Sequence, residues 1–410
     1  MATPETYDAF AIVAPGLEEL ARRELRELGA RGPRMIEGGV SFRASRELLY
    51  RANLCARVVS RVVVRASVFH AASFPELERR LKRVDWSRWL TSHVPTRVRV
   101  TCRKSRLYHS DAVAERVSTV VAAATGSAPE TGGDDEGDDD GGQRPAQLLL
   151  VRLDHDECTV SIDSSGQLLH QRGYRLAASK APLRETLAAG AINATLKAQY
   201  KAIFDPMCGS GTIPIEVAML LRRIPPGLSR TFAFQRWPDF DQALWERVRG
   251  AAEAGILPSA GIPIIASDRD QGAIKSALDN AKRAGVLGDI VFEAKPISAS
   301  SAPPNVGRGL LLSNPPYGVR VGDRDSLRDL YARFGSVLRE RFAGWDLALI
   351  SADRRLEAQL RVSLRDVLSF SNGGIPVRLV VGSIDGGLSN TNAKDNPRKS
   401  LTADHTRVEN

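Results

Sequence analysis

Residues 202–212, AIFDPMCGSGT, decide the fold of this 410-residue chain. The apolar AIF is typical of a short buried strand, and the glycines at 209 and 211 favour a tight turn after it. The apolar spacing of the residues that follow predicts a helix over 213–223. A strand, a glycine turn and a helix in this order are typical of a doubly wound α/β sheet.

The same alternation continues on both sides of this stretch. Further helices are predicted over 182–200, 271–285 and 326–342, and further strands over 262–268, 290–294, 309–314 and 346–352. Apolar strands with helices between them indicate a parallel sheet that is covered on both faces. The Pro- and Trp-bearing residues before the strand at 262 are interpreted as an insertion.

The chain before residue 174 has a different order of elements. Strands are predicted over 9–16, 58–69 and 96–104, helices over 17–30, 74–84 and 111–124, and a hairpin over 148–165. The segment 126–147 is rich in Gly and Asp and has no apolar residue larger than Ala or Pro, so a disordered loop is predicted there. The polar residues 388–410 are predicted to be a disordered tail.

The composition bounds the class of protein. With 43% hydrophobic and 26% charged residues, the chain can form two or three globular domains. No apolar run reaches the roughly 18 residues of a membrane helix, and no basic region precedes an apolar stretch at the N-terminus. The cysteines have no CxxC spacing, which is typical of free thiols in a reducing cytosol. We therefore expect a cytoplasmic protein with no membrane partner.

The positive charge is concentrated in the first part of the chain. Residues 1–125 carry 22 Lys and Arg against 13 Asp and Glu, whereas the rest of the chain is balanced. This distribution favours contact between the N-terminal half and a polyanion. A solvated basic surface is the alternative interpretation of the charge alone.

The glycine turn is the first of three motifs that indicate chemistry. Ligands of doubly wound sheets bind beyond the carboxyl ends of the strands, and glycines let backbone N–H groups approach them closely. The N-terminus of the following helix favours a carboxylate, such as that of a methionine moiety. The turn lacks the Lys-Ser/Thr of a P-loop, which argues against a nucleoside triphosphate. An ordinary strand–helix turn is an equal interpretation of this motif alone.

Asp268 is the second motif, because it ends the strand predicted over 262–268. An acidic residue at this place can accept hydrogen bonds from both hydroxyls of a ribose. Asp270 is expected to cap the helix that follows. Alone, Asp268 would be an equally good cap or turn residue; together with the glycine turn, it favours ribose binding.

The third and most specific motif is Ser313-Asn314-Pro315-Pro316-Tyr317-Gly318, after the apolar strand. An aromatic amine is a poor nucleophile because its lone pair is delocalised into the ring. If the Asn314 side-chain oxygen and the Pro315 carbonyl each accept one N–H, they favour a tetrahedral nitrogen whose lone pair faces a methyl group. Pro315 and Pro316 fix the shape of the turn, and Tyr317 offers a flat surface for an extruded base. The alternative is a rigid proline turn without a catalytic role.

Together, these motifs resemble the class I S-adenosylmethionine-dependent methyltransferases that modify amino groups. Residues 205–212, 226–240 and 173–192 further resemble the THUMP-domain methyltransferases that make N2-methylguanine in large-subunit ribosomal RNA. Residues 51–90 resemble the region entering the THUMP domain, and 100–117 resemble part of its RNA-binding face. The resemblance covers roughly residues 5–385, without the acidic loop.

The resemblance implies an α/β fold in which an α+β N-terminal region, ferredoxin-like plus THUMP, precedes a Rossmann-like methyltransferase domain with a doubly wound sheet. The implied boundaries are 1–65 for the ferredoxin-like domain, 66–170 for the THUMP domain with its loop 126–147, 171–387 for the methyltransferase domain and 388–410 for the tail.

The resemblance also implies roles for individual residues. S-adenosylmethionine would be bound by Asp268 and by the turn residues Asp205, Met207, Cys208, Gly209, Ser210, Gly211 and Thr212. The guanine would be held by Asn314, Pro315, Pro316 and Tyr317. The candidates for phosphate contacts are Arg103, Lys104 and Arg106.

Two departures from the family pattern stand out. Pro296 occupies the position where the family usually has an acid near the adenine amino group, so either a backbone group makes this contact or the cofactor binds less tightly. Some family members also carry a second methyltransferase domain, for which this chain is expected to end too early.

The expected partner is RNA, as large-subunit ribosomal RNA or a pre-ribosomal particle, and no DNA is expected. Methylation of the same amine in transfer RNA is the close alternative. Adenine methylation of DNA and glutamine methylation of a protein are disfavoured by the basic N-terminal half. An RNA-binding assembly factor with a degenerate cofactor pocket is the alternative outside enzymes, and only Pro296 supports it.

Overall fold

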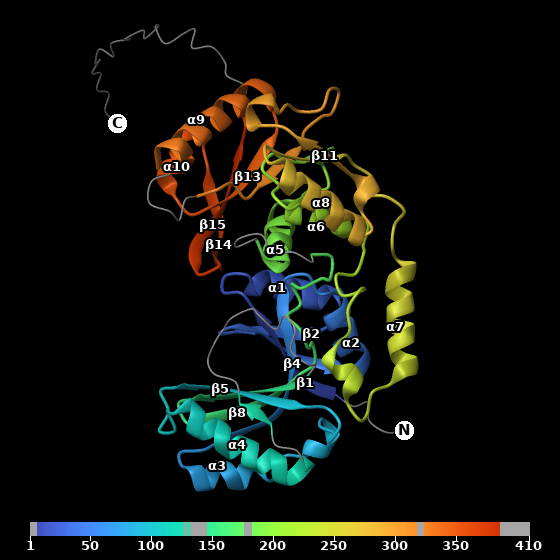
Figure 1. Cartoon of the computed structure of the whole chain (residues 1–410), viewed down its shortest axis with the longest axis vertical. Helices are drawn as coiled ribbons and strands as arrows, with labels where there is room; N and C mark the ends of the chain where they lie inside the picture. Colours follow the sequence, from blue (N-terminus) through green and yellow to red (C-terminus); the bar gives the residue numbers. More distant parts are fainter. Residues whose placement is uncertain (1–5, 127–128, 132–145, 176–182, 318–323, 386–410) are drawn as a thin grey trace, which may run out of the picture.

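The computed structural model describes residues 6–126, 129–131, 146–175, 183–317 and 324–385. These residues form two sheets, one of eight strands in the N-terminal half and one of seven strands in the C-terminal half. The two halves lie one above the other along the long axis of the molecule (Figure 1). No helix of the described part is long and apolar enough to cross a membrane.

The first sheet has the strand order β2-β3-β1-β4-β8-β7-β5-β6. Its strands are β1 (Thr6–Val13), β2 (Arg31–Ile36), β3 (Gly39–Ser45), β4 (Val59–His70), β5 (Thr96–Arg103), β6 (Glu130–Thr131), β7 (Gln147–Asp154) and β8 (Glu157–Asp163). The long strand β4 pairs with β1 through its first residues and with β8 from Val63 onward. The boundary implied at residue 65 therefore lies within one continuous strand, where the pairing with β8 shifts between Arg65 and Ser67.

Four helices accompany this sheet: α1 (Glu18–Glu27), α2 (Arg46–Cys55), α3 (Phe74–Leu81) and α4 (Ser110–Thr125). The predicted hairpin is confirmed, because β7 and β8 pair antiparallel and join β5 and β4, respectively. The prediction of disorder over 126–147 is wrong at Glu130–Thr131, which pair with Arg97 and Val98 of β5. Residues 127–128, 132–145 and the predicted tail lie outside the described residues.

The second sheet has the strand order β11-β10-β9-β12-β13-β15-β14. Its strands are β9 (Ile203–Asp205), β10 (Ile264–Asp268), β11 (Ile290–Ala294), β12 (Leu310–Ser313), β13 (Asp346–Ser351), β14 (Arg365–Asn372) and β15 (Ile375–Ser383), and its helices include α5 (Glu185–Thr195), α6 (Thr212–Leu221), α8 (Gln271–Arg283), α9 (Arg324–Arg341) and α10 (Arg354–Gln359). The first five strands in sequence order are parallel, as predicted. The strands β14 and β15 had not been predicted, and β15 pairs antiparallel with both β13 and β14.

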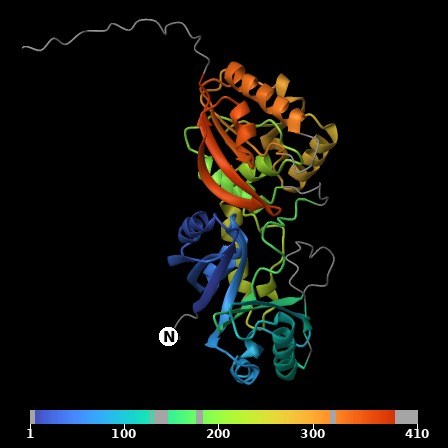
Figure 2. The ribbon, with the colours of Figure 1, turned by 90° about the vertical axis from the view of Figure 1, so that its left-hand side faces the viewer.

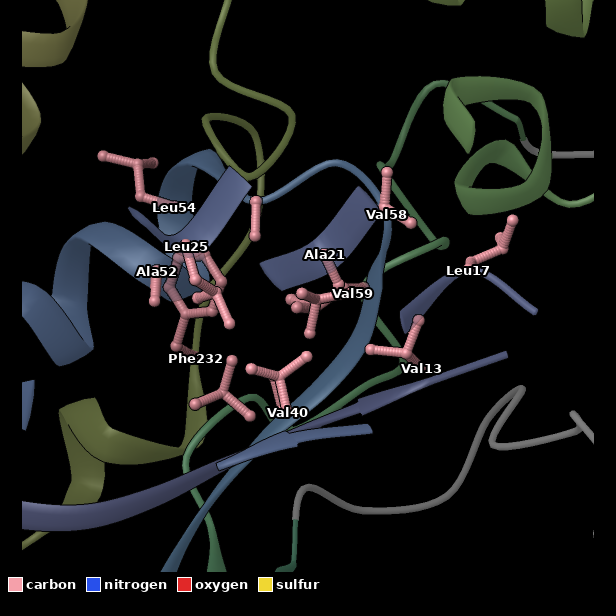
Figure 3. Packing of buried hydrophobic residues seen from close by; sticks show 14 of the residues in the cluster. Val13, Leu17, Ala21, Leu25, Val40, Ala52, Leu54, Val58, Val59 and Phe232 are labelled. Atoms are coloured by element: carbon pink, nitrogen blue, oxygen red, sulfur yellow. The ribbon is translucent and has the colours of Figure 1, made fainter. Parts of the chain in front are cut away.

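The insertion before β10 joins the two halves. It contains the short helix η2 (Ala233–Arg236) and the helix α7 (Gln242–Ala254), which had not been predicted and which packs against α2. The Phe234 ring stacks on Tyr50 of α2 at 4.3 Å between centroids. Figure 3 shows Phe232 in the same cluster of buried side chains as Leu25, Ala52 and Leu54 of the N-terminal half. Phe232 and Phe234 are fully buried, and burial of two large apolar side chains stabilises the contact of the insertion with the N-terminal half.

Candidate active site

The three motifs lie at the carboxyl ends of three neighbouring strands. Asp205 ends β9, Asp268 ends β10 and Ser313 ends β12, and β9 lies between the other two. Parallel strands bring their carboxyl ends to one edge of a sheet, where the ligands of this fold bind. The structure therefore brings the glycine turn, Asp268 and the proline turn together, as the sequence predicted.

Asp205 joins the glycine turn to the proline turn. Its side chain is buried, and its Oδ1 accepts hydrogen bonds from the Ser313 hydroxyl at 2.6 Å and from the Met207 N–H at 3.2 Å. Burial raises the pKa of Asp205 to about 7, against the effect of these hydrogen bonds. Asp205 thus fixes the position of the glycine turn relative to the proline turn.

The glycine turn is fixed by contacts with the next strand and helix. The Cys208 N–H donates to the Ser267 carbonyl at 2.9 Å, and the Asn280 amide of α8 donates to the Ser210 carbonyl at 3.0 Å. Gly211 has a φ of +85°, and a Cβ there would lie 3.0 Å from the Ala277 Cβ. Gly209 has a φ of +53°, and a Cβ there would meet no atom within 4 Å. The backbone at Gly209 therefore faces open space that a ligand can enter.

Asp268 reaches back to the glycine turn. Its Oδ2 accepts the Gly209 N–H at 2.9 Å, and its Oδ1 accepts the Asp270 N–H at 3.0 Å. A carboxylate oxygen has further lone pairs, so Asp268 can still accept hydroxyl hydrogens. The expectation for Asp270 is confirmed, because its side chain accepts the N–H groups of Gly272 and Ala273 at the start of α8.

Thr212 introduces two residues that the sequence reasoning had missed. Its buried hydroxyl accepts a hydrogen bond from the Arg175 guanidinium, which also lies 3.5 Å from the Glu185 carboxylate. Burial raises the pKa of Glu185 to about 7. Arg175 places a positive charge beside the N-terminus of α6. Both residues lie in the stretch 173–192, and the resemblance of this stretch to the THUMP-domain methyltransferases is the signal that could have indicated them.

The proline turn contains a buried acceptor without a donor. The Asn314 Oδ1 atom is buried and has no hydrogen-bond partner among the described residues. Buried polar atoms are nearly always hydrogen-bonded, and one left unsatisfied costs about 1–3 kcal/mol. Pro315 is buried and Pro316 is exposed. The turn therefore presents an oxygen that is ready to accept an N–H from a ligand.

Tyr317 and the proline turn are held by two residues that the sequence did not indicate. The Asn372 amide at the end of β14 donates to the Tyr317 hydroxyl at 2.8 Å. The Tyr331 hydroxyl of α9 donates to the Pro316 carbonyl at 3.3 Å. The turn is thus anchored on two sides. Residues 318–323, which follow it, lie outside the described residues.

Pro296 lies at the same edge of the sheet, shortly after β11. The preceding Lys295 donates its N–H to the Asp268 carbonyl at 2.9 Å, and the following Ile297 is buried. Proline has neither a carboxylate nor an N–H, so this position offers no polar side-chain contact to an adenine.

The predicted phosphate contacts lie in the other half of the molecule. Arg103 ends β5, and Lys104 and Arg106 follow it before α4. The elements β5 and α4 lie in the lower part of Figure 1, whereas α6, which follows the glycine turn, lies in the upper part. Arg103 pairs with Glu37 at 2.5 Å and Arg106 with Asp156 at 3.6 Å. The neighbouring Tyr108 is 69% exposed and was missed by the sequence reasoning. The structure groups these residues with one another and not with the active site.

Comparison with known proteins decides the family. The model of an RMKL-like methyltransferase domain matches residues 172–378, and that of an RlmL ferredoxin-like domain matches residues 8–63. The chain belongs to the RMKL-like methyltransferase family. Membership confirms the expected fold class, a class I methyltransferase domain after a ferredoxin-like domain, and S-adenosylmethionine as the methyl donor. The THUMP assignment, the domain boundaries and the residue roles stay predictions.

Three similar proteins illustrate the family. A putative RNA methyltransferase of Synechocystis is 34% identical over 382 residues, covering 92% of this chain and 97% of the relative. The ribosomal RNA large subunit methyltransferase K/L of Methylococcus capsulatus is 36% identical over 396 residues, covering 93% of this chain. The chain spans about half of that relative, 52% of its length. The crystal structure of SMU.472, a putative methyltransferase complexed with SAH, has a TM-score of 0.80 at 27% identity and covers 93% of this chain and 99% of its own.

Proposed function

We propose that this RMKL-like methyltransferase transfers a methyl group from S-adenosylmethionine to the exocyclic N2 amine of a guanine in large-subunit ribosomal RNA. The observation that carries the proposal is the buried Asn314 Oδ1 atom, which has no donor among the described residues. It lies next to Ser313, which is hydrogen-bonded to the strand that leads into the glycine turn. An N–H acceptor is therefore held beside the glycine turn.

The residues around the glycine turn fit the cofactor. Gly209 leaves open space beside its backbone, and Asp268 presents a carboxylate for the ribose hydroxyls. The N-terminus of α6, with Arg175 beside it, would hold the carboxylate of the methionine moiety. When bound, S-adenosylmethionine supplies a methyl group on a positively charged sulfur.

The proline turn prepares the amine for attack. Asn314 Oδ1 and the Pro315 carbonyl would each accept one N–H, which concentrates the nitrogen lone pair in the direction of the methyl group. The charge that develops on the nitrogen is stabilised by these fixed dipoles, and no reorganisation is needed during the reaction. Tyr317 would lie against the face of the purine after the base has left its stack. The chain's contribution is thus orientation and electrostatics.

The N-terminal half would bind the RNA. Relatives that cover most of this chain are named putative RNA methyltransferase and ribosomal RNA large subunit methyltransferase K/L. Arg103, Lys104 and Arg106 would contact phosphates, and the exposed Tyr108 would stack on an unpaired base beside them. Phosphate contacts position the RNA, and the active site selects the amine.

Transfer of labelled methyl groups tests this function. Purified protein is incubated with S-adenosylmethionine and, in separate reactions, with large-subunit ribosomal RNA, transfer RNA and DNA from cells lacking the protein. The expected result is N2-methylguanosine in ribosomal RNA only. Methylation confined to transfer RNA, or a methylated adenine in DNA, would overturn the proposed substrate.

A further inference from the structure

The tip of the β14–β15 hairpin lies against the proline turn. β14 ends at Asn372, which pairs with Ile375 across the two-residue loop Gly373–Gly374. The φ angles of these glycines are +58° and +81°, as a type I′ turn requires, and this turn matches the twist of its strands. The position of Asn372 is therefore set by the backbone of the hairpin.

The Asn372 side chain is directed at the tyrosine of the proline turn. It is 7% exposed, and its Nδ2 donates to the Tyr317 hydroxyl at 2.8 Å. A hydrogen bond at the distal oxygen of a phenol restricts the direction in which the ring lies. The rest of the turn is held by the bond from Tyr331 to the Pro316 carbonyl. Among the described residues, Asn372 thus fixes the position of the Tyr317 hydroxyl.

The same strand also packs on the N-terminal half. A Cβ on Gly16, in the turn between β1 and α1, would lie only 1.8 Å from the Ser369 carbonyl oxygen of β14. Figure 2 shows the hairpin extending from the C-terminal sheet toward the top of the N-terminal half. One strand therefore contacts both the N-terminal half and, through Asn372, the proline turn.

We propose that Asn372 is a positioning residue for methyl transfer, which acts through the Tyr317 hydroxyl to hold the ring as the surface for the target purine. The proposal rests on the proposed function of the same site. Asn372 has no direct contact with the reacting atoms in this account. Its loss should lower turnover because the purine is less well oriented, while cofactor binding stays unchanged.

A double-mutant cycle tests this role. Asn372→Ala and Tyr317→Phe should each lower kcat about five- to tenfold, and the double variant should be no slower than the slower single variant. Asn372→Asp should recover most of the activity, because its carboxylate can accept a hydrogen bond from the tyrosine hydroxyl. Ser371→Ala, an exposed change in the same hairpin, is the matched control and should behave as the unaltered protein.

The readout is the total labelled methyl transferred to RNA, whichever nucleoside carries it. Methylation of a base other than guanine would thus overturn the proposed substrate, but the double-mutant cycle would still test the role of Asn372. Losses that multiply in the double variant, or no loss in Asn372→Ala, would overturn the role of Asn372 alone. The absence of any transfer to RNA by the unaltered protein would overturn both proposals. Melting temperatures and S-adenosylmethionine affinities of all variants complete the comparison, and a loss of cofactor affinity in Asn372→Ala would contradict a positioning role.

Discussion

The Ser313 hydroxyl donates a hydrogen bond of 2.6 Å to the Asp205 carboxylate, and this bond joins two turns that are 108 residues apart in the sequence. In the proposed function, one turn borders the cofactor and the other presents the acceptor of the target amine. Neither residue needs to touch a substrate for the contact to matter. It fixes one turn relative to the other, and methyl transfer depends on the distance and alignment of the reacting groups.

The pH dependence of stability should report on this buried carboxylate. The pKa of Asp205 is raised from 3.8 to about 7, so the folded protein binds more protons than the unfolded chain between these pH values. The contribution of Asp205 to stability therefore falls as the pH rises from about 4 to about 7, by up to about 1.4 kcal/mol per pH unit. Asp205→Asn keeps an acceptor for Ser313 but does not titrate.

Denaturant unfolding of both proteins across this pH range provides the measurement. Other buried acids, such as Glu185, titrate in the same range and are shared by the two proteins. The difference in unfolding free energy therefore isolates Asp205. A difference that stays constant from pH 4 to 7 would show that the folded pKa is not raised.

Removing the unsatisfied acceptor should separate stability from activity. Asn314→Ala deletes a buried oxygen that has no partner among the described residues. We therefore expect the melting temperature to rise slightly. The turnover should fall by a factor of about 100 or more, as for other fixed groups that stabilise developing charge. The affinity for S-adenosylmethionine, measured by calorimetry, should stay nearly unchanged. Unchanged turnover would refute the role of Asn314.

Asp268→Ala should act on the cofactor. Loss of charge-assisted hydrogen bonds to the ribose predicts an affinity for S-adenosylmethionine about 10- to 100-fold weaker by calorimetry. Asp270→Ala is the matched control, since its carboxylate caps α8. It should lower stability by about 1 kcal/mol and leave the affinity intact. Equal affinities of the two variants would remove Asp268 from the ribose site.

Neutralising the basic residues after β5 should change the salt dependence of RNA binding. Each phosphate contact contributes about 0.7–0.9 to the slope of log K against log salt concentration, so replacing Arg103, Lys104 and Arg106 by Ala should lower this slope by up to about 2–3. Because Arg103 and Arg106 already pair with Glu37 and Asp156, the slope should decrease by less than three full phosphate contacts would give. Replacing the exposed Arg247 and Arg249 of α7 is the control. An unchanged slope in the first variant would place the RNA surface elsewhere.

The parts of the structure that follow from local sequence were predictable. The strand of residues 203–205 is apolar and ends in a glycine turn, and the strand of residues 310–313 is apolar and ends in a proline turn. In a parallel sheet, these patterns place both turns at one edge. The proximity of the glycine turn and the proline turn could therefore be predicted without knowledge of the hydrogen bond between Ser313 and Asp205.

The parts that depend on tertiary contacts were not predictable. β14 alternates between exposed and buried residues only over its last four positions, 369–372, and its pairing with β15 is irregular between Asp366 and Leu368. In α7, only Trp245 and Val248 are buried, which is too few for a clear apolar face. Asn372 meets Tyr317 across 55 residues through a contact that no periodicity encodes.

The most direct test of the central claim is nucleoside analysis by mass spectrometry after a single turnover on large-subunit ribosomal RNA. At one fixed early time, the protein should have produced N2-methylguanosine, and Asn314→Ala with bound S-adenosylmethionine should have produced about 100-fold less. A methyl group on a ring nitrogen or a ribose, or equal yields of N2-methylguanosine from both proteins, would contradict the assignment of the proline turn as the holder of the amine.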